Sequence, residues 1–329
     1  MNITSAHGGG GRLMNELIHA VFRRHFSNPT LDRMEDAALL PPANGKIAFT
    51  TDSFVVSPLF FPGGDIGRLA VCGTVNDILM RGAVPKYLSA GFILEEGLEL
   101  SVLERVVSSM KRTADEAGVE IVTGDTKVIE GNGGMYINTA GIGILESPVD
   151  ISIQNAKIGD AVVISGQLGD HHACILSSRM DIENDIRSDC APLVDMVNTL
   201  IKSGIEVHAM RDITRGGLAS VLNEIATGSC VQIEVFSNIA LAGSQVQGFC
   251  DILGLDPLYM GNEGKLALVL PQKEAEKAVS MLQGCRYGEH AQIIGTVYAG
   301  KKPAVWQRSR AGGTRLIEPL LGEGLPRIC

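Results

Sequence analysis

The sequence predicts an α+β protein with two lobes and a loose C-terminal segment. At 329 residues the chain is long enough for two domains. A hydrophobic content of 45% is ample for two large cores. Short β-rich runs alternate with stretches of helical spacing in both halves, and Ser147-Pro148 interrupts this alternation near the middle.

The first half is expected to form alternating strands and helices. β-rich or alternating runs predict strands over 47–51, 87–94, 119–123 and 135–145. Helical spacing predicts helices over 66–80 and 102–117. Residues 13–26 form an amphipathic, partly basic stretch, which we expect to be a helix lying on the core.

The second half repeats the mixture. Strands are predicted over 161–165, near 207, and over 231–235, 265–270 and 291–298. Helices are predicted over 168–179, 191–203 and 214–227, with a further one ending near 253. We therefore expect an N-terminal domain of residues 1–150, a C-terminal domain of residues 151–310, and a flexible tail of residues 311–329.

Composition excludes several classes of function. A net charge of −9 makes nucleic acid a poor partner, because binding to a phosphate backbone needs a basic surface. The sequence contains no run of about 18 apolar residues, so it predicts no membrane span. The N-terminus lacks the pattern of a secretory signal. The seven cysteines never form C-x-x-C, which argues against a disulfide framework and against zinc. We expect a reducing, cytoplasmic location.

Cys329 differs from the other cysteines because it is the last residue of the sequence. The preceding residues, Gly322, Gly324 and Pro326 among them, carry too little apolar surface to fold. One interpretation is an arm that presents a reactive sulfur. The alternative is a frayed end that happens to finish in cysteine.

Five aspartates end or interrupt apolar runs: Asp36, Asp52, Asp77, Asp125 and Asp212. Each alone is equally explained as a turn former or helix cap. Asp77 is the hardest to explain structurally, since a carboxylate within an apolar helical pattern is costly unless it is paired or metal-bound. Convergent oxygens of this kind suit Mg²⁺, which shares them with the phosphates of a nucleotide.

Other segments offer groups that complement phosphate. The glycine run at 8–11 could wrap backbone N–H groups around an anion, but alone it is weak evidence, and a flexible N-terminus is the alternative that explains it better. Lys127 and Arg215 are candidate phosphate-binding cations, and Thr214 is either an anion site at a helix start or a plain N-cap. Glu263 precedes a predicted strand and is equally a turn residue. His171 and His172 are expected to be helix-cap or core residues rather than metal ligands.

Together these segments resemble a known superfamily. The resemblance is carried, in order, by residues 7–12, 35–38, 50–53, 76–78, 122–127, 211–217 and 262–265. The chain is similar to the aminoimidazole-ribonucleotide synthetase-like (PurM-like) superfamily. Within it, residues 58–64, residues 91–97 and the ending Pro326-Arg327-Ile328-Cys329 resemble the carbamoyl dehydratase family of [NiFe]-hydrogenase maturation. One departure is Glu35, where many superfamily members carry a second aspartate.

The resemblance implies a fold and an assembly. The N-terminal domain is expected to pair its sheet with that of a second copy across a two-fold axis, giving a homodimer. The C-terminal domain is expected to be an α/β sandwich, followed by the flexible tail.

The resemblance also implies an ATP- and Mg²⁺-dependent reaction on the chain's own tail. A carbamoyltransferase, HypF, loads a carbamoyl group onto Cys329, ATP drives its dehydration to a thiocyanate, and the cyano group passes to iron on the HypC–HypD complex. The catalytic residues are expected to be Cys329, Glu263 as base, and Lys127. The residues expected to bind ATP are Asp36, Asp52, Asp77, Thr123, Gly124, Asp125, Thr126 and Arg215. The expected metal ligands are Asp36, Asp52, Asp77, Asp125 and Asp212.

Two rival interpretations remain at the level of the sequence. Another branch of the superfamily, with selenophosphate or thiamine-phosphate chemistry, would act on a diffusible substrate and leave Cys329 without a role. A non-enzymatic nucleotide-sensing scaffold would use its tail only to dock onto partners. In that case ATP turnover would not depend on Cys329.

Overall fold

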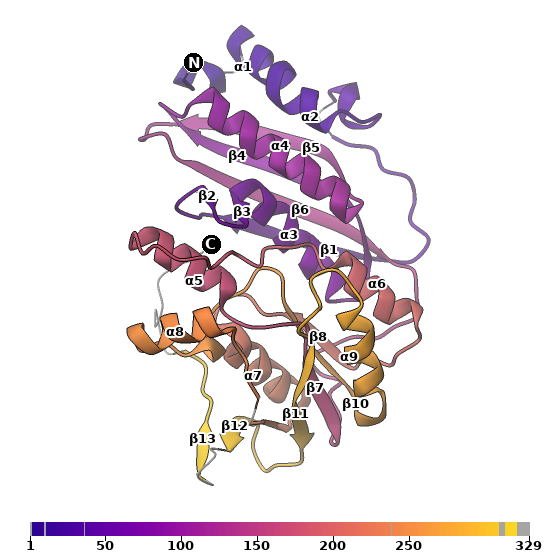
Figure 1. Cartoon of the computed structure of the whole chain (residues 1–329). Coiled ribbons are helices and arrows are strands. Elements are labelled where there is room, and N and C mark those ends of the chain that lie inside the picture. The colour runs from indigo at the N-terminus through magenta and orange to yellow at the C-terminus, as the bar shows by residue number, and fades with distance from the viewer. Residues whose placement is uncertain (1, 10, 36, 238, 309–312, 321–329) are drawn as a thin grey trace.

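The structure, a computed structural model, describes residues 2–9, 11–35, 37–237, 239–308 and 313–320. Two predicted site residues, Asp36 and Cys329, lie outside the described residues. Figure 1 shows two lobes stacked one above the other, each with its own sheet, which confirms the predicted α+β class. None of the described helices combines the length and hydropathy needed to cross a bilayer.

The first lobe is built on a four-stranded sheet. Its strands lie in the order β1 (Lys46–Phe54), β6 (Met135–Leu145), β4 (Val84–Glu95) and β5 (Glu120–Ile129). Only β4 and β5 are parallel. Two helices, α3 (Ile66–Leu79) and α4 (Leu100–Ala117), bury their apolar side chains against one face. On the other face Ile47 and Phe49 are 63% and 68% exposed, so this face carries uncovered apolar side chains.

The helix predicted over 13–26 is present and is continuous from residue 12 to residue 26. It consists of α1 (Arg12–Leu17), a π-helical turn η2 (Ile18–Arg23) and α2 (Arg24–Phe26). Leu17, Val21 and Phe26 are buried, so the helix lies on the core as expected. In Figure 1 it runs beside α4 at the outer end of the first lobe.

The second lobe is built on a seven-stranded mixed sheet. Its strands lie in the order β13 (Thr314–Leu316), β12 (Ala304–Arg308), β9 (Gln232–Val235), β11 (Gln292–Tyr298), β7 (Asp160–Ile164), β10 (Leu266–Pro271) and β8 (Ala209–Asp212). Its helices are α5 (Asp170–Arg179), α6 (Val194–Lys202), α7 (Gly217–Ser229), α8 (Ser244–Leu253) and α9 (Ala275–Gln283). The interior strand β7 is buried along its whole length.

Three elements of the second lobe were not predicted. Helix α9 has a weak apolar stripe in which two of the three buried positions are alanines, so its periodicity is faint. Strands β12 and β13 are short, and β13 is fully exposed. β13 lies inside the predicted tail, and Ile317 after it is 1% exposed. The chain is therefore packed on the lobe at least as far as Ile317. The predicted domain bounds themselves stay a prediction.

Candidate functional site

Three of the predicted metal ligands, Asp52, Asp77 and Asp212, come together where the two lobes meet. Asp52 belongs to β1, Asp77 to α3, and Asp212 ends β8. Burial and then the charge of Asp77 raise the pKa of Asp52 to about 6 and that of Asp212 to about 7. Thr50 Oγ1 donates a hydrogen bond to Asp77 Oδ2 at 2.8 Å. The charge of Asp77 thus acts on both of the other carboxylates, and the three together make this point of the junction electronegative.

Glu263 lies beside this cluster and is 5% exposed. Burial, followed by the charges of Asp212 and Asp189, raises the pKa of Glu263 well above the usual range of a glutamate. Asp189 Oδ1 accepts the backbone N–H of Glu263 at 3.1 Å, and Ala191 N donates to the Glu263 carbonyl at 3.3 Å. A carboxylate held in this setting is a strong proton acceptor once it is ionised.

The neighbours of Glu263 in the sequence shape its loop. Asn262 is fully buried; its Oδ1 accepts from Gly169 N at 2.8 Å, and its Nδ2 donates to the Ile213 carbonyl at 3.0 Å. A Cβ atom at Gly264 would lie 1.9 Å from the Asp189 carbonyl oxygen. The two loops can approach this closely only because residue 264 has no side chain.

One face of α3 ties the two lobes together at this point. Arg68, Cys72 and Asn76 are spaced four residues apart, so they share that face. Arg68 Nε donates to the Cys190 carbonyl at 2.8 Å, and Asn76 Oδ1 accepts from Leu193 N at 2.9 Å. The neighbouring Cys72 thiol, together with burial, raises the pKa of Cys190 well above its usual value. Asn76, which is 2% exposed, therefore positions the second lobe against the acidic cluster.

Arg215 lies near the same cluster, because its charge opposes the raised pKa of Asp52. It sits in the loop between β8 and α7 and is exposed. The helix predicted from Thr214 begins at Gly217, with Gly216 as its N-cap at a φ of 76°. Thr214 is thus not the cap. Arg215 therefore lies in the turn that precedes α7, exposed and close enough to Asp52 for its charge to act on that carboxylate.

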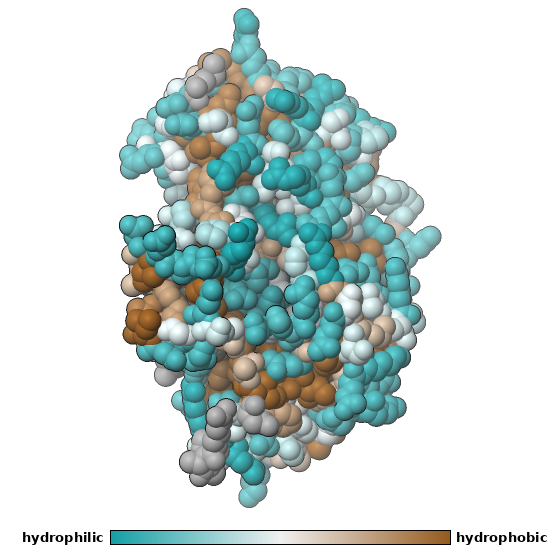
Figure 2. All heavy atoms as spheres, in the orientation of Figure 1, coloured by the Kyte–Doolittle hydropathy of each residue, from teal (hydrophilic) through white to brown (hydrophobic). Residues whose placement is uncertain are grey.

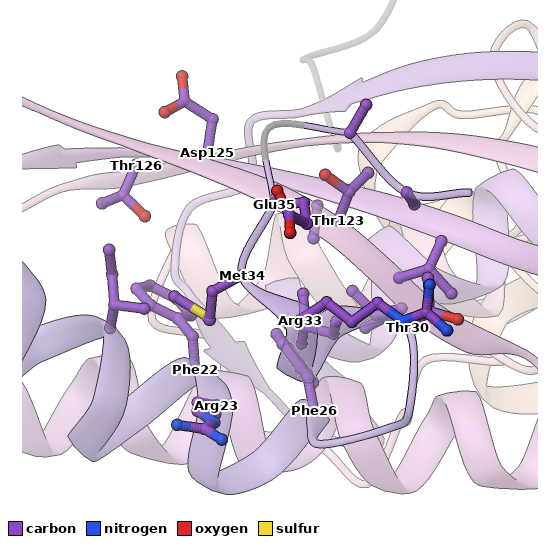
Figure 3. Close-up of a pocket in the computed structure, with 18 of the residues that line it drawn as sticks. Phe22, Arg23, Phe26, Thr30, Arg33, Met34, Glu35, Thr123, Asp125 and Thr126 are labelled. Atoms are coloured by element: carbon purple, nitrogen blue, oxygen red, sulfur yellow. The ribbon is translucent and has the colours of Figure 1, made fainter.

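A second group of predicted residues lines a cavity of about 500 Å³ in the first lobe (Figure 3). Residues 123–126 of β5 contribute to its wall, which includes the predicted ATP ligands Thr123, Gly124, Asp125 and Thr126. Phe22, Phe26 and Met34 supply apolar surface, and Glu35 contributes a carboxylate. A cavity with apolar walls and a few convergent polar groups has the character of a small-molecule site.

Asp125 and Lys127 form an exposed ion pair, with Lys127 Nζ 2.8 Å from both carboxylate oxygens. The hydrogen bond from Lys127 lowers the pKa of Asp125. The strand predicted to end at Thr123 continues to Ile129, so Asp125 lies within β5 rather than at its end. Gly124 resembles a turn residue in the sequence, but it serves a close approach: a Cβ there would lie 2.6 Å from the Ala90 carbonyl oxygen.

The structure does not bring Asp125 to the other carboxylates. β1 and β5 are the two edges of the sheet, so three strand spacings, about 14 Å, separate Asp52 from the β5 edge. Asp52 points to the face covered by α3, and Asp125 and Lys127 point to the uncovered face. Within the described ranges, no group of three or more His, Cys, Asp or Glu side chains could hold a metal ion.

The histidine pair at 171 and 172 is buried in α5 rather than placed at a metal site. His171 Nδ1 lies 2.7 Å from Ser188 Oγ. No motif in the sequence predicts the roles of Arg68, Asn76 and Asp189. Their partners come from the other lobe or from a distant loop, and no local spacing in the sequence indicates such contacts.

Two protein-family models match the chain, each over one lobe. The model for the N-terminal domain of AIR synthase related proteins matches residues 34–145, and the model for the C-terminal domain matches residues 157–307.

Known proteins are similar along the full length. Carbamoyl dehydratase HypE of Rhodobacter capsulatus is 45% identical over 335 residues, covering 99% of this chain and 98% of the relative. A crystal structure of hydrogenase maturation protein HypE in complex with ATP is 47% identical with a TM-score of 0.94, covering 99% of both chains. A crystal structure of a HypE–HypF complex gives 44% identity and a TM-score of 0.80, covering 94% of this chain and 100% of that one.

Proposed function

Since the chain belongs to the HypE family of carbamoyl dehydratases, which act in hydrogenase maturation, we propose the following reaction for it. HypF loads a carbamoyl group onto Cys329, and ATP drives the dehydration of that group to a thiocyanate. The cyano group then passes to iron on the HypC–HypD complex in the cytoplasm. A full-length likeness to a HypE solved with ATP, and to one solved with HypF, supports the nucleotide and the first partner.

ATP is needed because the carbamoyl oxygen is a poor leaving group. In the proposed sequence this oxygen attacks the γ-phosphorus, and ADP leaves. The nitrogen then loses two protons, the carbon–oxygen bond breaks, and phosphate departs as the carbon–nitrogen triple bond forms. The carbamoyl thioester and ATP thus become thiocyanate, ADP and phosphate. Catalysis of phosphoryl transfer consists mostly of positioning and charge stabilisation.

Glu263 is the proposed base for a nitrogen proton. The single observation that carries the proposal is this buried carboxylate with a raised pKa, held beside the acidic cluster at the junction of the lobes. A base that accepts protons from a weakly acidic N–H group gains from such a pKa. Lys127 is proposed to contact the phosphates or the activated oxygen.

The nucleotide is proposed to use both parts of the site. The apolar part of the 500 Å³ cavity would hold the nucleobase, and residues 123–126 would bind polar groups of the nucleotide. Arg215 would bind one of its phosphates. Asp52, Asp77 and Asp212 offer the carboxylate oxygens that Mg²⁺ prefers, and we propose that they bind it together with ligands from outside the described residues of this chain. Bound there with phosphate oxygens, Mg²⁺ would supply charge neutralisation at the reacting phosphoryl group. Asp36 is proposed as a further ligand.

A homodimer would unite groups that one chain keeps apart. Asp125 and Lys127 lie on the uncovered sheet face, together with the exposed side chains of Ile47 and Phe49. We propose that this face pairs with that of a second copy. Asp125 of that copy would then complete the acidic cluster, which fits the finding that the described residues of one chain hold no group of three or more His, Cys, Asp or Glu side chains able to bind a metal ion.

Twelve residues of the sequence follow Ile317, the last anchored position before Cys329. Ile317 is anchored by a bond from its N–H to the Val305 carbonyl at 2.8 Å and by Asn223 Nδ2, which donates to the Ile317 carbonyl at 2.9 Å. The twelve residues that follow could span up to about 40 Å when extended. This reach supports a thiol that visits both HypF and its own active site.

Phosphate release tests the proposal. Protein carrying a carbamoyl group on Cys329 should release one phosphate per loaded chain when MgATP is added. Unloaded protein and the Cys329→Ala variant should release almost none. Equal ATP turnover in all three samples would instead favour a site whose chemistry ignores the tail.

A further inference from the structure

Two buried cysteines, Cys72 of the first lobe and Cys190 of the second, lie next to each other at the junction of the lobes. Cys72 is fully buried, and Cys190 is 3% exposed. We infer that hydrogen peroxide converts these two thiols into a reversible disulfide, which cross-links the lobes. The formation of this bond is independent of the proposed function. Its effect on dehydration rests on the proposed function, because it acts through Glu263.

The contacts of α3 place the Cys72 thiol against the segment that contains Cys190. In Figure 1, α3 lies on the side of the first lobe that meets the second lobe. Four residues before Cys72, Arg68 Nε donates to the Cys190 carbonyl at 2.8 Å. Four residues after it, Asn76 Nδ2 donates to the Ala191 carbonyl at 3.1 Å. Cys72 lies between these two bonds on the same face of the helix, so its thiol and that of Cys190 are neighbours.

The sequence offers no other thiol for a bond between the lobes. Cys72 is the only cysteine in residues 1–150. Three other buried thiols of the second lobe have partners that are not thiols: Cys174 Sγ lies 3.3 Å from the Pro62 carbonyl oxygen, Cys285 Sγ lies 3.3 Å from the Met281 carbonyl oxygen, and Cys250 Sγ lies 3.2 Å from Met260 Sδ. A disulfide that joins the lobes therefore has to use Cys72, and Cys190 is its neighbour.

A cavity of about 560 Å³ gives small molecules access to Cys190. Both lobes line it, since Arg68 comes from α3 and Cys190 and Lys265 come from the second lobe. One water molecule takes up about 30 Å³, so hydrogen peroxide fits easily. Cys72 does not line the cavity. Cys190 is therefore the thiol that meets the oxidant, and Cys72 is the thiol that resolves it.

The oxidation balances in two steps. The Cys190 sulfur attacks one oxygen of hydrogen peroxide, the O–O bond breaks, and Cys190 becomes a sulfenic acid as one water leaves. The Cys72 sulfur then attacks the Cys190 sulfur, the S–O bond breaks, and a second water leaves with the proton of Cys72. The two thiols lose two electrons, and the peroxide gains them.

The surroundings of Cys190 make this oxidation slow. The Cys72 thiol and burial raise the pKa of Cys190 well above its usual value, whereas the charge of Arg68 lowers it. The thiolate is the form of cysteine that attacks peroxide, and a raised pKa makes it scarce. The pair therefore responds to sustained exposure, and an exposed thiol such as that of Cys230 is oxidised first.

The segment around Cys190 also holds Glu263 in place. Asp189 Oδ1 accepts the N–H of Glu263 at 3.1 Å, and Ala191 N donates to the Glu263 carbonyl at 3.3 Å. A disulfide brings its two sulfurs to about 2.05 Å, which draws Cys190 and both of its neighbours toward α3. Since a misplacement of about 1 Å in an active site costs about 10²-fold in rate, we expect dehydration to slow about 10- to 100-fold.

Peptide mapping tests the bond itself. Full-length Cys329→Ala protein, which has no tail thiol to compete, would be treated with hydrogen peroxide until the pattern of oxidation no longer changes. After unfolding and alkylation of the remaining thiols, proteolysis should give two peptides joined through Cys72 and Cys190, which a reductant separates. Cys174→Ser, which removes another buried thiol, should keep the cross-link, and Cys72→Ser should lose it. Any other final state of Cys190 in the folded protein, once Cys230 is oxidised, would overturn the inference.

The effect on the reaction would be measured in wild-type protein whose Cys329 already carries the carbamoyl group, which shields that sulfur from the oxidant. After oxidation and addition of MgATP, dehydration should be about 10- to 100-fold slower, and a phosphine reductant should restore the rate. Cys72→Ser should dehydrate at the same rate before and after oxidation. A cross-linked protein with an unchanged rate would overturn the effect on Glu263 and leave the proposed function intact. Loaded protein that never loses water even before oxidation would instead refute the proposed function.

Discussion

At the scale of single residues, Glu263 combines an unfavourable location with a chemical role. Its carboxylate is almost fully buried and is surrounded by other acids, so its charged form is costly in the free protein. We expect Glu263→Gln to slow dehydration by about 10²- to 10⁴-fold, the usual contribution of a general base.

The same substitution should leave the melting temperature unchanged or raise it, because an uncompensated buried carboxylate is removed. Phosphate release and thermal unfolding check the two halves of this prediction. Full activity in Glu263→Gln would mean that another group takes the proton.

The acidic cluster predicts a stabilising effect of MgATP that depends on pH. The folded-state pKa values of about 6 for Asp52 and about 7 for Asp212 lie above the values of the unfolded chain. The native state therefore holds more protons between about pH 4 and 7, and stability declines as the pH rises through this window.

A cation that binds only the ionised carboxylates should restore this loss. We expect MgATP, compared with ATP and a chelator, to raise the melting temperature at pH 8 and to have little effect at pH 5. At 100-fold excess over Kd the gain would be about 2.7 kcal/mol. Asp212→Asn should abolish the shift and Asp185→Asn should keep it. A shift of equal size at both pH values would contradict the assignment.

At the scale of elements, α3 is the structural link between the lobes. Asn76 lies in the middle of this apolar helix, and its side chain is the acceptor for the N–H of Leu193. Asn76→Ala should lower the free energy of unfolding by about 1 to 3 kcal/mol, because a buried N–H group loses its partner. Chemical denaturation measures this, with the exposed Asn15→Ala as the control. Equal losses in both variants would show that the Asn76 bond contributes nothing specific.

The elements show how far local sequence patterns reach. Strands β1, β4 and β6 and helix α4 followed from alternation and helical spacing, because each has one more buried face, whereas α3 followed from a long apolar run and is buried on almost all sides. β5 was predicted too short because Gly124 and Asp125 resemble a turn. In the site, Asp52, Asp77 and Asp212 come from segments up to 160 positions apart, so only the resemblance could group them. Nothing in the sequence around Asp189 predicted its role, since its hydrogen bond with the backbone N–H of Glu263 forms only after folding.

At the scale of the whole molecule, a site shared between two copies predicts that two inactive variants can complement each other in mixed dimers. Asp52→Asn and Asp125→Asn should each be inactive alone. Mixed dimers would contain one intact site, so exchange of subunits in an equal mixture should restore about a quarter of the wild-type activity. A mixture that exchanges subunits but stays inactive would contradict a shared site. It would mean either that Asp52 and Asp125 belong to the site of the same chain, or that Asp125 is not part of the site.

The surface view in Figure 2 shows hydrophilic residues over much of the region where the lobes meet, beside separate hydrophobic areas. In the proposed reaction, a charged nucleotide and the tail must both reach the few side chains at the junction of the lobes. A polar surface there suits both. In the proposed reaction, the order of events is loading of Cys329, return of the tail, and dehydration at the junction.

The mass of the C-terminal peptide tests this account most directly. The full-length protein would be incubated with HypF, carbamoyl phosphate and MgATP, and the peptide containing Cys329 would be weighed over time. We expect a carbamoyl adduct that then loses the mass of one water, in step with phosphate release, and no change in Cys329→Ala. A tail that stays unmodified while ATP is consumed at its normal rate would contradict the account.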